Sequence, residues 1–366
     1  MRLVYMLTSL AMGGAERQTI ALAEWMAAHG HTIALIVLRP RQPEEWSTRL
    51  DVLYLDMHKS LTSVSVGLVR ARRFLKMFRP DLVHSHTYPA NLFARLLKVF
   101  IPSPVVSTMH NVYEGRRMRM LAYRLTDSLS LRTTAVSEAV AHHAIENHAV
   151  PIHKCVVITN AFDTAAFAPD RARRIETREK FEAGDDFIWL AAGRMVSAKG
   201  FVNLLKAFSE VWVVHPETQL WIAGSDSDNS PRKARYTAFV VRKGTMERVR
   251  RLGLNRDMPA LLDAADGFVL SSAWEGMPLV VGEAMAMEKP VVATDVGGVR
   301  ELLDTAGAIV PPRSAERLAE AMLNLMEQTL DARRVLGRKA RARVVKHFNS
   351  ATRFLEWEAF YHSLCS

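Results

Sequence analysis

Cysteine is scarce in this sequence, which has only Cys155 and Cys365 among its 366 residues. Because the two lie far apart along the chain, we expect neither a disulfide framework nor a closely spaced cysteine pair for zinc. Long apolar runs are also absent. Residues 278–287 form one of the longest, and a glycine and a glutamate interrupt it well short of the roughly 18 residues of a membrane span. The sequence therefore predicts a cytoplasmic protein without a transmembrane helix.

The amino terminus resembles a secretory signal peptide, because Arg2 precedes the apolar residues 3–12 and small residues follow them. The next segment, residues 16–30, has apolar side chains at helical spacing. We interpret the two segments as strand, glycine turn and helix of one folded unit. The signal peptide remains the alternative.

The composition is that of a folded globular protein, with 49% hydrophobic residues, 23% charged residues and a mean hydropathy of zero. Disordered and fibrous proteins are excluded. Since domains contain roughly 100–200 residues, the length predicts two of them.

Positive charge is concentrated in the first half of the chain: residues 1–168 carry +7 of the net charge of +10. Residues 70–79 and 116–124 alternate basic with apolar side chains at helical spacing, which suits an anionic membrane surface. No nucleic-acid motif accompanies them, so nucleic acid is not an expected partner. A solvated helix face is the alternative. The side chains expected to insert partly into lipid are Phe74, Met118, Met120 or Leu121.

Short apolar runs alternate with helical patterns throughout the chain, which predicts an α/β protein with two doubly wound parallel sheets. The charged residues 163–186 separate the two series, and the helical tail has an aromatic face at residues 350–364. The first series of expected strands is 2–8, 32–38, 51–55, 82–85, 104–108, 133–136 and 156–159. The second is 187–193, 219–223, 267–271, 290–293 and 308–310.

Gly13 and Gly14 join the first expected strand to its helix. Glycine there permits positive φ and close backbone approach, and the amides of a helix N-terminus suit a diphosphate. The segment lacks the full G-x-G-x-x-G pattern of dinucleotide binders, so a tight turn without a ligand is the alternative.

Arg194 and Lys199 lie in a short loop, 193-GRMVSAKG-200, between an apolar strand and a helix. The loop follows the carboxyl end of a parallel strand, where ligands of such sheets bind. Two cations there predict a phosphate site. The alternative is surface salt bridging.

Two glutamates mark the segment after the strand at residues 267–271. Glu275 lies in the loop before Pro278, which fits the first turn of a helix, and Glu283 lies within that helix among apolar residues. A carboxylate in such surroundings requires a partner, and the hydroxyls of a ribose would supply one. A structural salt bridge is the alternative.

Seven segments, taken together and in order, resemble retaining glycosyltransferases of family 4, of the GT-B fold and of the type that builds bacterial polysaccharides and lipid-linked glycans. They are 13-GGAE-16, 83-VHSH-86, 106-VSTMHN-111, 135-AVSEA-139, 193-GRMVSAKG-200, 252-LGLNRDMPALLDAAD-266 and the Glu-x₇-Glu segment that ends before 290-PVVATDVGG-298.

The resemblance implies three parts. Residues 1–168 would bind the acceptor, residues 169–348 would bind the nucleotide-sugar donor across a cleft, and residues 349–366 would form a helix that packs back on the first domain. One departure is Ala161, where such proteins usually have glycine.

The resemblance also implies roles for single residues. Arg194 and Lys199 would hold the donor diphosphate, Glu283 the ribose, and Glu275 the transferred sugar. His110 would lie against that sugar from the acceptor side, whereas His84 and His86 are interpreted as structural. Besides Gly13 and Gly14, the expected donor-binding backbone is Gly276, Met277, Pro278 and Leu279. The catalytic residues would be Glu275, Arg194, Lys199 and His110.

The expected function is transfer of a hexose or N-acetylhexosamine, with retained configuration, from a nucleoside diphosphate sugar to a glycan or lipid-linked acceptor in cell-surface polysaccharide synthesis. The expected donor is a UDP-sugar, and the expected place is the cytoplasm, with peripheral contact with the cytoplasmic membrane. Asp226 and Asp228 have the spacing of a metal motif, but because two cations already serve the diphosphate we expect neither metal nor cofactor. A UDP-N-acetylglucosamine 2-epimerase and a non-catalytic nucleotide-sugar-binding subunit are the alternatives.

Overall fold

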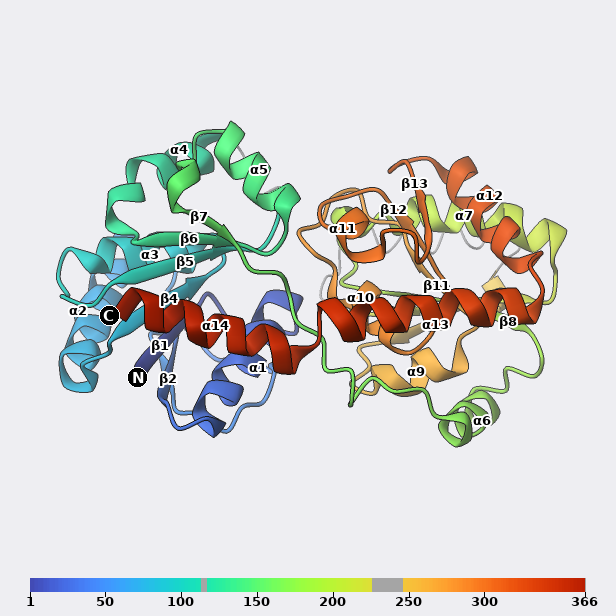
Figure 1. Ribbon diagram of the computed structural model, residues 1–366, viewed down its shortest axis with the longest axis horizontal. Helices are drawn as coiled ribbons and strands as arrows, with labels where there is room; N and C mark the ends of the chain where they lie inside the picture. The colour runs from blue at the N-terminus through green and yellow to red at the C-terminus, as the bar shows by residue number, and fades with distance from the viewer. Residues whose placement is uncertain (113–116, 226–245, 366) are drawn as a thin grey trace. The chain divides into compact units, whose positions relative to one another are not determined.

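The computed structural model describes residues 1–112, 117–225 and 246–365. The chain divides into two compact units (Figure 1). The first contains Met1–Ala161 and Ala351–Ser366, and the second contains Phe162–Ser350. Asp226 and Asp228 lie outside the described residues. Within the described ranges, no helix is both long and apolar enough to span a membrane.

The first unit is built on a seven-stranded parallel sheet in the order β3-β2-β1-β4-β5-β6-β7. Strands β1, β2, β3 and β7 are nearly continuous apolar runs, as expected where helices cover both faces of a parallel sheet, whereas β4, β5 and β6 also contain buried His, Ser and Thr. The strands are β1 (Arg2–Leu7), β2 (Thr32–Val37), β3 (Val52–Tyr54), β4 (Leu82–His86), β5 (Val105–Met109), β6 (Arg132–Ala135) and β7 (Cys155–Val157). The helices are α1 (Gly14–Ala28), α2 (Leu61–Phe78), α3 (Tyr88–Lys98), α4 (Arg117–Leu125), α5 (Glu138–Glu146) and α14 (Ser350–Cys365).

Alternate side chains of β1 enter two hydrophobic clusters, one on each face of this sheet. Val4 and Met6 pack with the residues of α2 and α3, whereas Leu3 and Tyr5 pack with α1 and α14. Figure 1 shows α14 running across the strands of the first unit. Its aromatic side chains Phe354, Trp357 and Tyr361 are buried there. This contact confirms that the carboxyl-terminal helix packs back on the first unit.

The second unit has a six-stranded parallel sheet in the order β10-β9-β8-β11-β12-β13. Its strands are β8 (Phe187–Ala192), β9 (Thr218–Ala223), β10 (Val249–Gly253), β11 (Gly267–Leu270), β12 (Val291–Thr294) and β13 (Ala308–Val310). Its helices are α6 (Arg171–Lys180), α7 (Phe201–Val214), α9 (Met258–Ala264), α10 (Leu279–Ala286), α11 (Val299–Leu303), α12 (Ala315–Met326) and α13 (Leu330–His347). The fold class predicted from the sequence is therefore confirmed.

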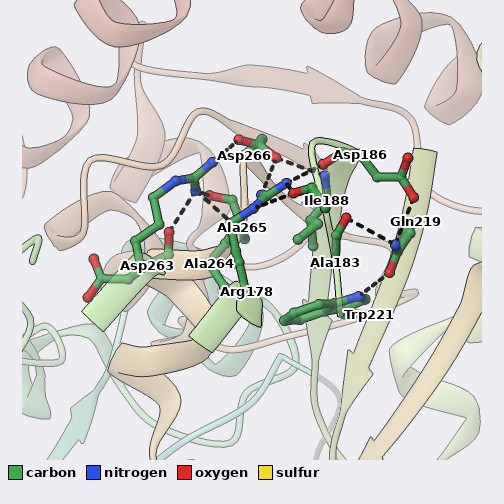
Figure 2. A network of polar contacts seen from close by, with 12 residues as sticks. Arg178, Ala183, Asp186, Ile188, Gln219, Trp221, Asp263, Ala264, Ala265 and Asp266 are labelled. Carbon is green, nitrogen blue, oxygen red and sulfur yellow. Dashed lines mark hydrogen bonds and ion pairs between the residues drawn. The ribbon is translucent and has the colours of Figure 1, made fainter. Parts of the chain in front are cut away.

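The charged segment that the sequence analysis placed between the two series forms helix α6 of the second unit. Figure 2 shows Arg178 among the carbonyl groups that end α9. It donates to the Ala264 oxygen at 2.9 Å and lies 3.2 Å from the Asp266 carboxylate. Because the last carbonyls of a helix lack intrahelical partners, these bonds fasten α6 to α9. Asp266 precedes β11, so the network lies at the amino edge of the sheet.

The first unit ends at Ala161, a few residues before the boundary expected after residue 168. The reason lies in the next residue, since the Phe162 amide donates to the carbonyl oxygen of Phe348 at 2.8 Å. The ring of Phe162 also packs on Gly282 of α10, where a Cβ atom would lie 2.2 Å from it. Phe162 is thus part of the second unit.

The two basic, apolar helices of the first unit expose fewer of the expected membrane residues than the sequence suggested. Met118 and Leu121 are exposed on α4, but Met120 is buried and Phe74 packs against the core beside α3. Of the four side chains named for insertion, Met120 is therefore already covered on the inner face of its helix, and Phe74 is half-buried.

Candidate active site

In the second unit, two loops at the carboxyl edge of the sheet bring Lys199 and Glu275 together. Nζ of Lys199 lies 2.6 Å from Oε1 of Glu275, and the Ser272 hydroxyl donates to the same oxygen at 2.6 Å. The two charged side chains are 19% and 11% exposed. Their charge-assisted bond is thus partly shielded from water and still accessible to a ligand.

Close backbone contacts fasten these loops to each other. Gly200 has a φ of +61°, and a Cβ atom on it would lie 2.0 Å from the carbonyl oxygen of Ser271. The Ser271 hydroxyl in turn donates to the Lys199 carbonyl oxygen at 2.8 Å. Only glycine permits both the positive φ and the approach, so Gly200 sets the position of Lys199.

The segment after Glu275 is held in a similar way. Gly297 has a φ of +53°, and a Cβ atom there would lie 2.4 Å from the Glu275 carbonyl oxygen. The amide of Gly298 donates to the carbonyl oxygen of Gly276 at 2.6 Å. The chain therefore enters α10 in a fixed conformation.

The sequence predicted that Pro278 lies in the first turn of α10. In the structure Pro278 is instead the N-cap of this helix. The first amides of a helix have no intrahelical partner, so those at the start of α10 are suited to an anion.

Glu283 lies in the second turn of α10 and is 4% exposed. Arg194 is exposed in the same loop as Lys199. The structure thus brings Lys199, Glu275 and the segment Gly276–Leu279 together, and it places Arg194 and Glu283 on the same two segments.

In the first unit, His110 follows β5 and meets His86, the last residue of β4. Nδ1 of His86 lies 3.0 Å from Nε2 of His110. His84, two residues earlier on β4, has both ring nitrogens bonded, to the Tyr361 hydroxyl at 2.7 Å and to the Thr108 hydroxyl at 2.6 Å. His84 therefore joins β4 to α14 and β5, and His86 orients His110.

Loss of solvent changes the protonation of all three rings. It lowers the pKa of His110 to about 4, and it holds the pKa of His84 and His86 well below the usual value of 6.5. Near neutral pH the rings are uncharged, so each offers one donor and one acceptor nitrogen.

A small pocket lies beside this pair at the carboxyl edge of the sheet. Nε2 of His86 and the Thr159 hydroxyl are buried there without a hydrogen-bond partner among the described residues. Buried polar atoms are usually bonded, so these two are available to a hydroxyl-bearing ligand. The polar residues that line the pocket are Gln18, Thr19, His86, Thr108, His110, Thr159 and Asn160.

Gly13 and Gly14 occupy the predicted turn, but neither has a positive φ. Gly13 is the N-cap of α1, with extended backbone at φ −128°, and Gly14 is the first residue of the helix. A Cβ on Gly13 would lie 2.4 Å from a carboxylate oxygen of Glu16. That oxygen ends a flexible side chain that can move aside, so neither the backbone geometry nor this close approach requires glycine at position 13.

Ala161, the departure from the family pattern, is accommodated without strain. It is buried and does not have a positive φ. The Gln18 side chain bonds both its carbonyl oxygen, at 2.5 Å, and its amide, at 3.0 Å. The backbone here does not require glycine.

The contact between His86 and His110 was not predicted from the sequence. A signal was present, because both histidines follow apolar strands that are neighbours in a parallel sheet, and carboxyl ends of such strands meet at one edge. The register pairs His86 with Thr108, two residues before His110.

Comparisons with known proteins agree with this geometry. Residues 12–166 match the family model described as Glycosyltransferase Family 4, and residues 186–328 match Glycosyl transferases group 1. Together the two models match most of the chain.

Two relatives and one solved structure illustrate the similarity. The alpha-D-kanosaminyltransferase of Streptomyces kanamyceticus is 27% identical over 253 residues, which are 67% of this chain and 60% of the relative. The UDP-Gal:alpha-D-GlcNAc-diphosphoundecaprenol alpha-1,3-galactosyltransferase of Escherichia coli is 24% identical over 311 residues, 80% of this chain and 78% of the relative. Anabaena HepE in complex with UDP and glucose superposes with a TM-score of 0.89 at 20% identity, covering 99% of this chain and 100% of HepE.

The two family models, together with the two parallel-sheet units and the solved neighbour, lead to one conclusion: the chain belongs to the family 4 glycosyltransferases and has the GT-B fold.

Proposed function

We propose that this glycosyltransferase moves a hexose or N-acetylhexosamine from a UDP-sugar to a glycan or lipid-linked acceptor in cell-surface polysaccharide synthesis, with retention of the anomeric configuration. The observation that carries the proposal is the Lys199–Glu275 pair, held at 2.6 Å beside the start of α10. The UDP in the HepE complex and the lipid-linked substrate in the name of the Escherichia coli relative support the choice of donor and acceptor.

In this proposal the groups around the pair have distinct tasks. Lys199 and Arg194 bind the donor diphosphate together with the amides of the segment Gly276–Leu279. Glu275 accepts hydrogen bonds from the transferred sugar, and Glu283 accepts them from the ribose. His110, uncharged near neutral pH, bonds a sugar hydroxyl.

The reaction forms one bond and breaks one bond on the same face of the sugar. The bond from the anomeric carbon to the diphosphate oxygen breaks while the acceptor oxygen attacks that carbon, and the proton of the acceptor hydroxyl passes to the departing diphosphate. Negative charge grows on the leaving group. Cations and amides aimed at it stabilise the transition state more than the ground state.

We also propose that transfer needs no metal ion, because Lys199, Arg194 and the α10 amides supply the positive charge that a divalent ion would supply. The test is a panel of UDP-sugars incubated with and without EDTA, with slow hydrolysis or transfer as the readout. Release of UDP in EDTA is the expected result. Interconversion of the UDP-sugar without release of UDP would instead indicate the epimerase, and binding without any turnover would indicate the non-catalytic subunit.

We further propose that the first unit docks on anionic lipid at the cytoplasmic face of the membrane, where a lipid-linked acceptor would be found. On α2, Met77 is 70% exposed, and on α4, Met118 and Leu125 are 71% and 74% exposed. Basic side chains flank them, and each contributes about 1 kcal/mol near an anionic surface. The exposed basic residues of the two helices include Arg72, Arg73, Lys76, Arg117, Arg119 and Arg124.

Co-sedimentation with anionic vesicles tests the docking. The double variant Arg117→Glu/Arg124→Glu removes about 2 kcal/mol or more of attraction, so we expect roughly 30-fold weaker binding than for the parent. The matched control is Arg338→Glu/Lys339→Glu on α13, which changes the charge equally on exposed residues of the second unit. Equal binding by both double variants, or no binding by the parent at low salt, would contradict the docking.

A further inference from the structure

Three potential metal ligands meet where α14 crosses the amino end of β2. Nε2 of His31, the residue before β2, lies 2.7 Å from Oε1 of Glu358. His362 lies one helical turn after Glu358, and its ring centroid is 6.1 Å from that of His31. One ligand atom from each of the three residues lies within 4.8 Å of the other two. The spacing of four residues places Glu358 and His362 on one face of α14.

Two imidazoles and one carboxylate form a donor set that suits zinc. Zinc takes His nitrogen and carboxylate oxygen at about 2.0–2.2 Å in tetrahedral geometry, and three protein ligands leave the fourth position to water. His362 is exposed, and a change of its rotamer would close the remaining distance. His31 is 7% exposed, and its second nitrogen, Nδ1, lies 3.1 Å from the Met1 nitrogen.

We propose that His31, Glu358 and His362 bind one zinc-type divalent transition-metal ion, which fastens α14 to the first unit. The site is distinct from the proposed transfer chemistry. His31 precedes β2, so it lies at the amino edge of the parallel sheet, whereas His86 and His110 lie at its carboxyl edge. The ion would thus stabilise the packing of Phe354, Trp357 and Tyr361 and take no part in sugar transfer.

The test is calorimetric titration of the metal-free full chain with zinc chloride, in parallel with magnesium chloride. We expect one zinc equivalent to bind the parent and no magnesium, since imidazole ligands favour zinc. His362→Ala, at an exposed position, should weaken zinc binding by at least tenfold. The matched control is His142→Ala, because His142 and Glu146 form an exposed pair at the same spacing on α5, 3.2 Å apart, without a third ligand in the described chain. Its zinc affinity should equal that of the parent.

A second control addresses the exposed thiol of Cys365, which lies three residues after His362. Cys365→Ser should bind zinc as the parent does. Zinc at one hundred times its Kd should raise the melting temperature of the parent by about 5–10 °C and leave His362→Ala unchanged. The proposal is overturned if the parent binds no zinc, if His362→Ala binds as tightly as the parent, or if Cys365→Ser loses the binding. None of these outcomes depends on sugar transfer, so the site and the proposed function fail or succeed separately.

Discussion

Lys199→Ala is the substitution that isolates the contact proposed between Lys199 and the leaving diphosphate. In the free protein it removes a 2.6 Å charge-assisted bond and leaves the Glu275 carboxylate with the Ser272 hydroxyl. Since Glu275 is 11% exposed, its partial isolation should lower the free energy of unfolding by about 1–3 kcal/mol. In the reaction it removes a cation from the developing charge, which should cost about 2–4 kcal/mol of transition-state stabilisation, or roughly 30- to 1,000-fold in rate.

The assay is release of UDP at saturating donor, with circular dichroism and urea unfolding of the same samples. The matched control is Lys206→Ala, an exposed lysine on α7 that lies outside the loop. Its rate and stability should equal those of the parent. If Lys199→Ala kept the parent's turnover number while remaining folded, Lys199 would not act on the leaving group and the assigned role would be wrong.

Three further predictions test other parts of the account. Glu283→Gln should weaken binding of the intact donor, whereas a 2′,3′-dideoxyribose donor should bind parent and variant with equal affinity. If a calorimetric double-mutant cycle showed no coupling energy between Glu283 and the ribose hydroxyls, the ribose contact would be rejected. The pKa of His110 is lowered to about 4, so between pH 6.5 and 4 the unfolded chain binds more protons than the folded chain. The free energy of unfolding should therefore fall as the pH drops through that range. Above pH 6.5 this group should have no effect on it. Urea unfolding at several pH values should show a smaller fall in the free energy of unfolding for His110→Asn than for the parent. An equal fall would show that the pKa of His110 is not lowered in the folded protein. Tyr361→Phe leaves Nδ1 of His84 without its 2.7 Å partner and should cost about 1–3 kcal/mol in urea unfolding, whereas an unchanged midpoint would show that the bond adds nothing.

The parts of the fold that the sequence predicted are those where an apolar run and a buried strand coincide. β8 and β11 are such runs, and the loops that follow them contain Lys199 and Glu275. Edge strand β10 was not predicted because its sequence, Val-Arg-Arg-Leu-Gly, is not an apolar run and its residues are partly or fully accessible to solvent. Its Arg250 side chain donates to the carbonyl oxygen of Phe181, a contact without any sequence signal.

Tertiary pairing explains what else the sequence could not reveal. The sequence of α6 is rich in arginine and therefore indicated a linker between domains. The partners of these arginines are the carbonyl groups at the end of α9, about 90 residues later, so no local pattern in the sequence indicated the contact. His31 and Glu358 are separated by 327 residues, so no spacing rule could join them. Such contacts depend on which helix covers which sheet face, and local periodicity does not encode that choice.

The most direct test of the central claim is the stereochemistry of sugar release. Proton NMR, recorded on the first product formed from an α-linked UDP-sugar that the enzyme turns over, reads the configuration at the anomeric carbon before the free sugar equilibrates. Retaining transfer predicts the α-anomer together with UDP, with EDTA present throughout. Formation of the β-anomer, or a UDP-sugar converted without release of UDP, would contradict the account.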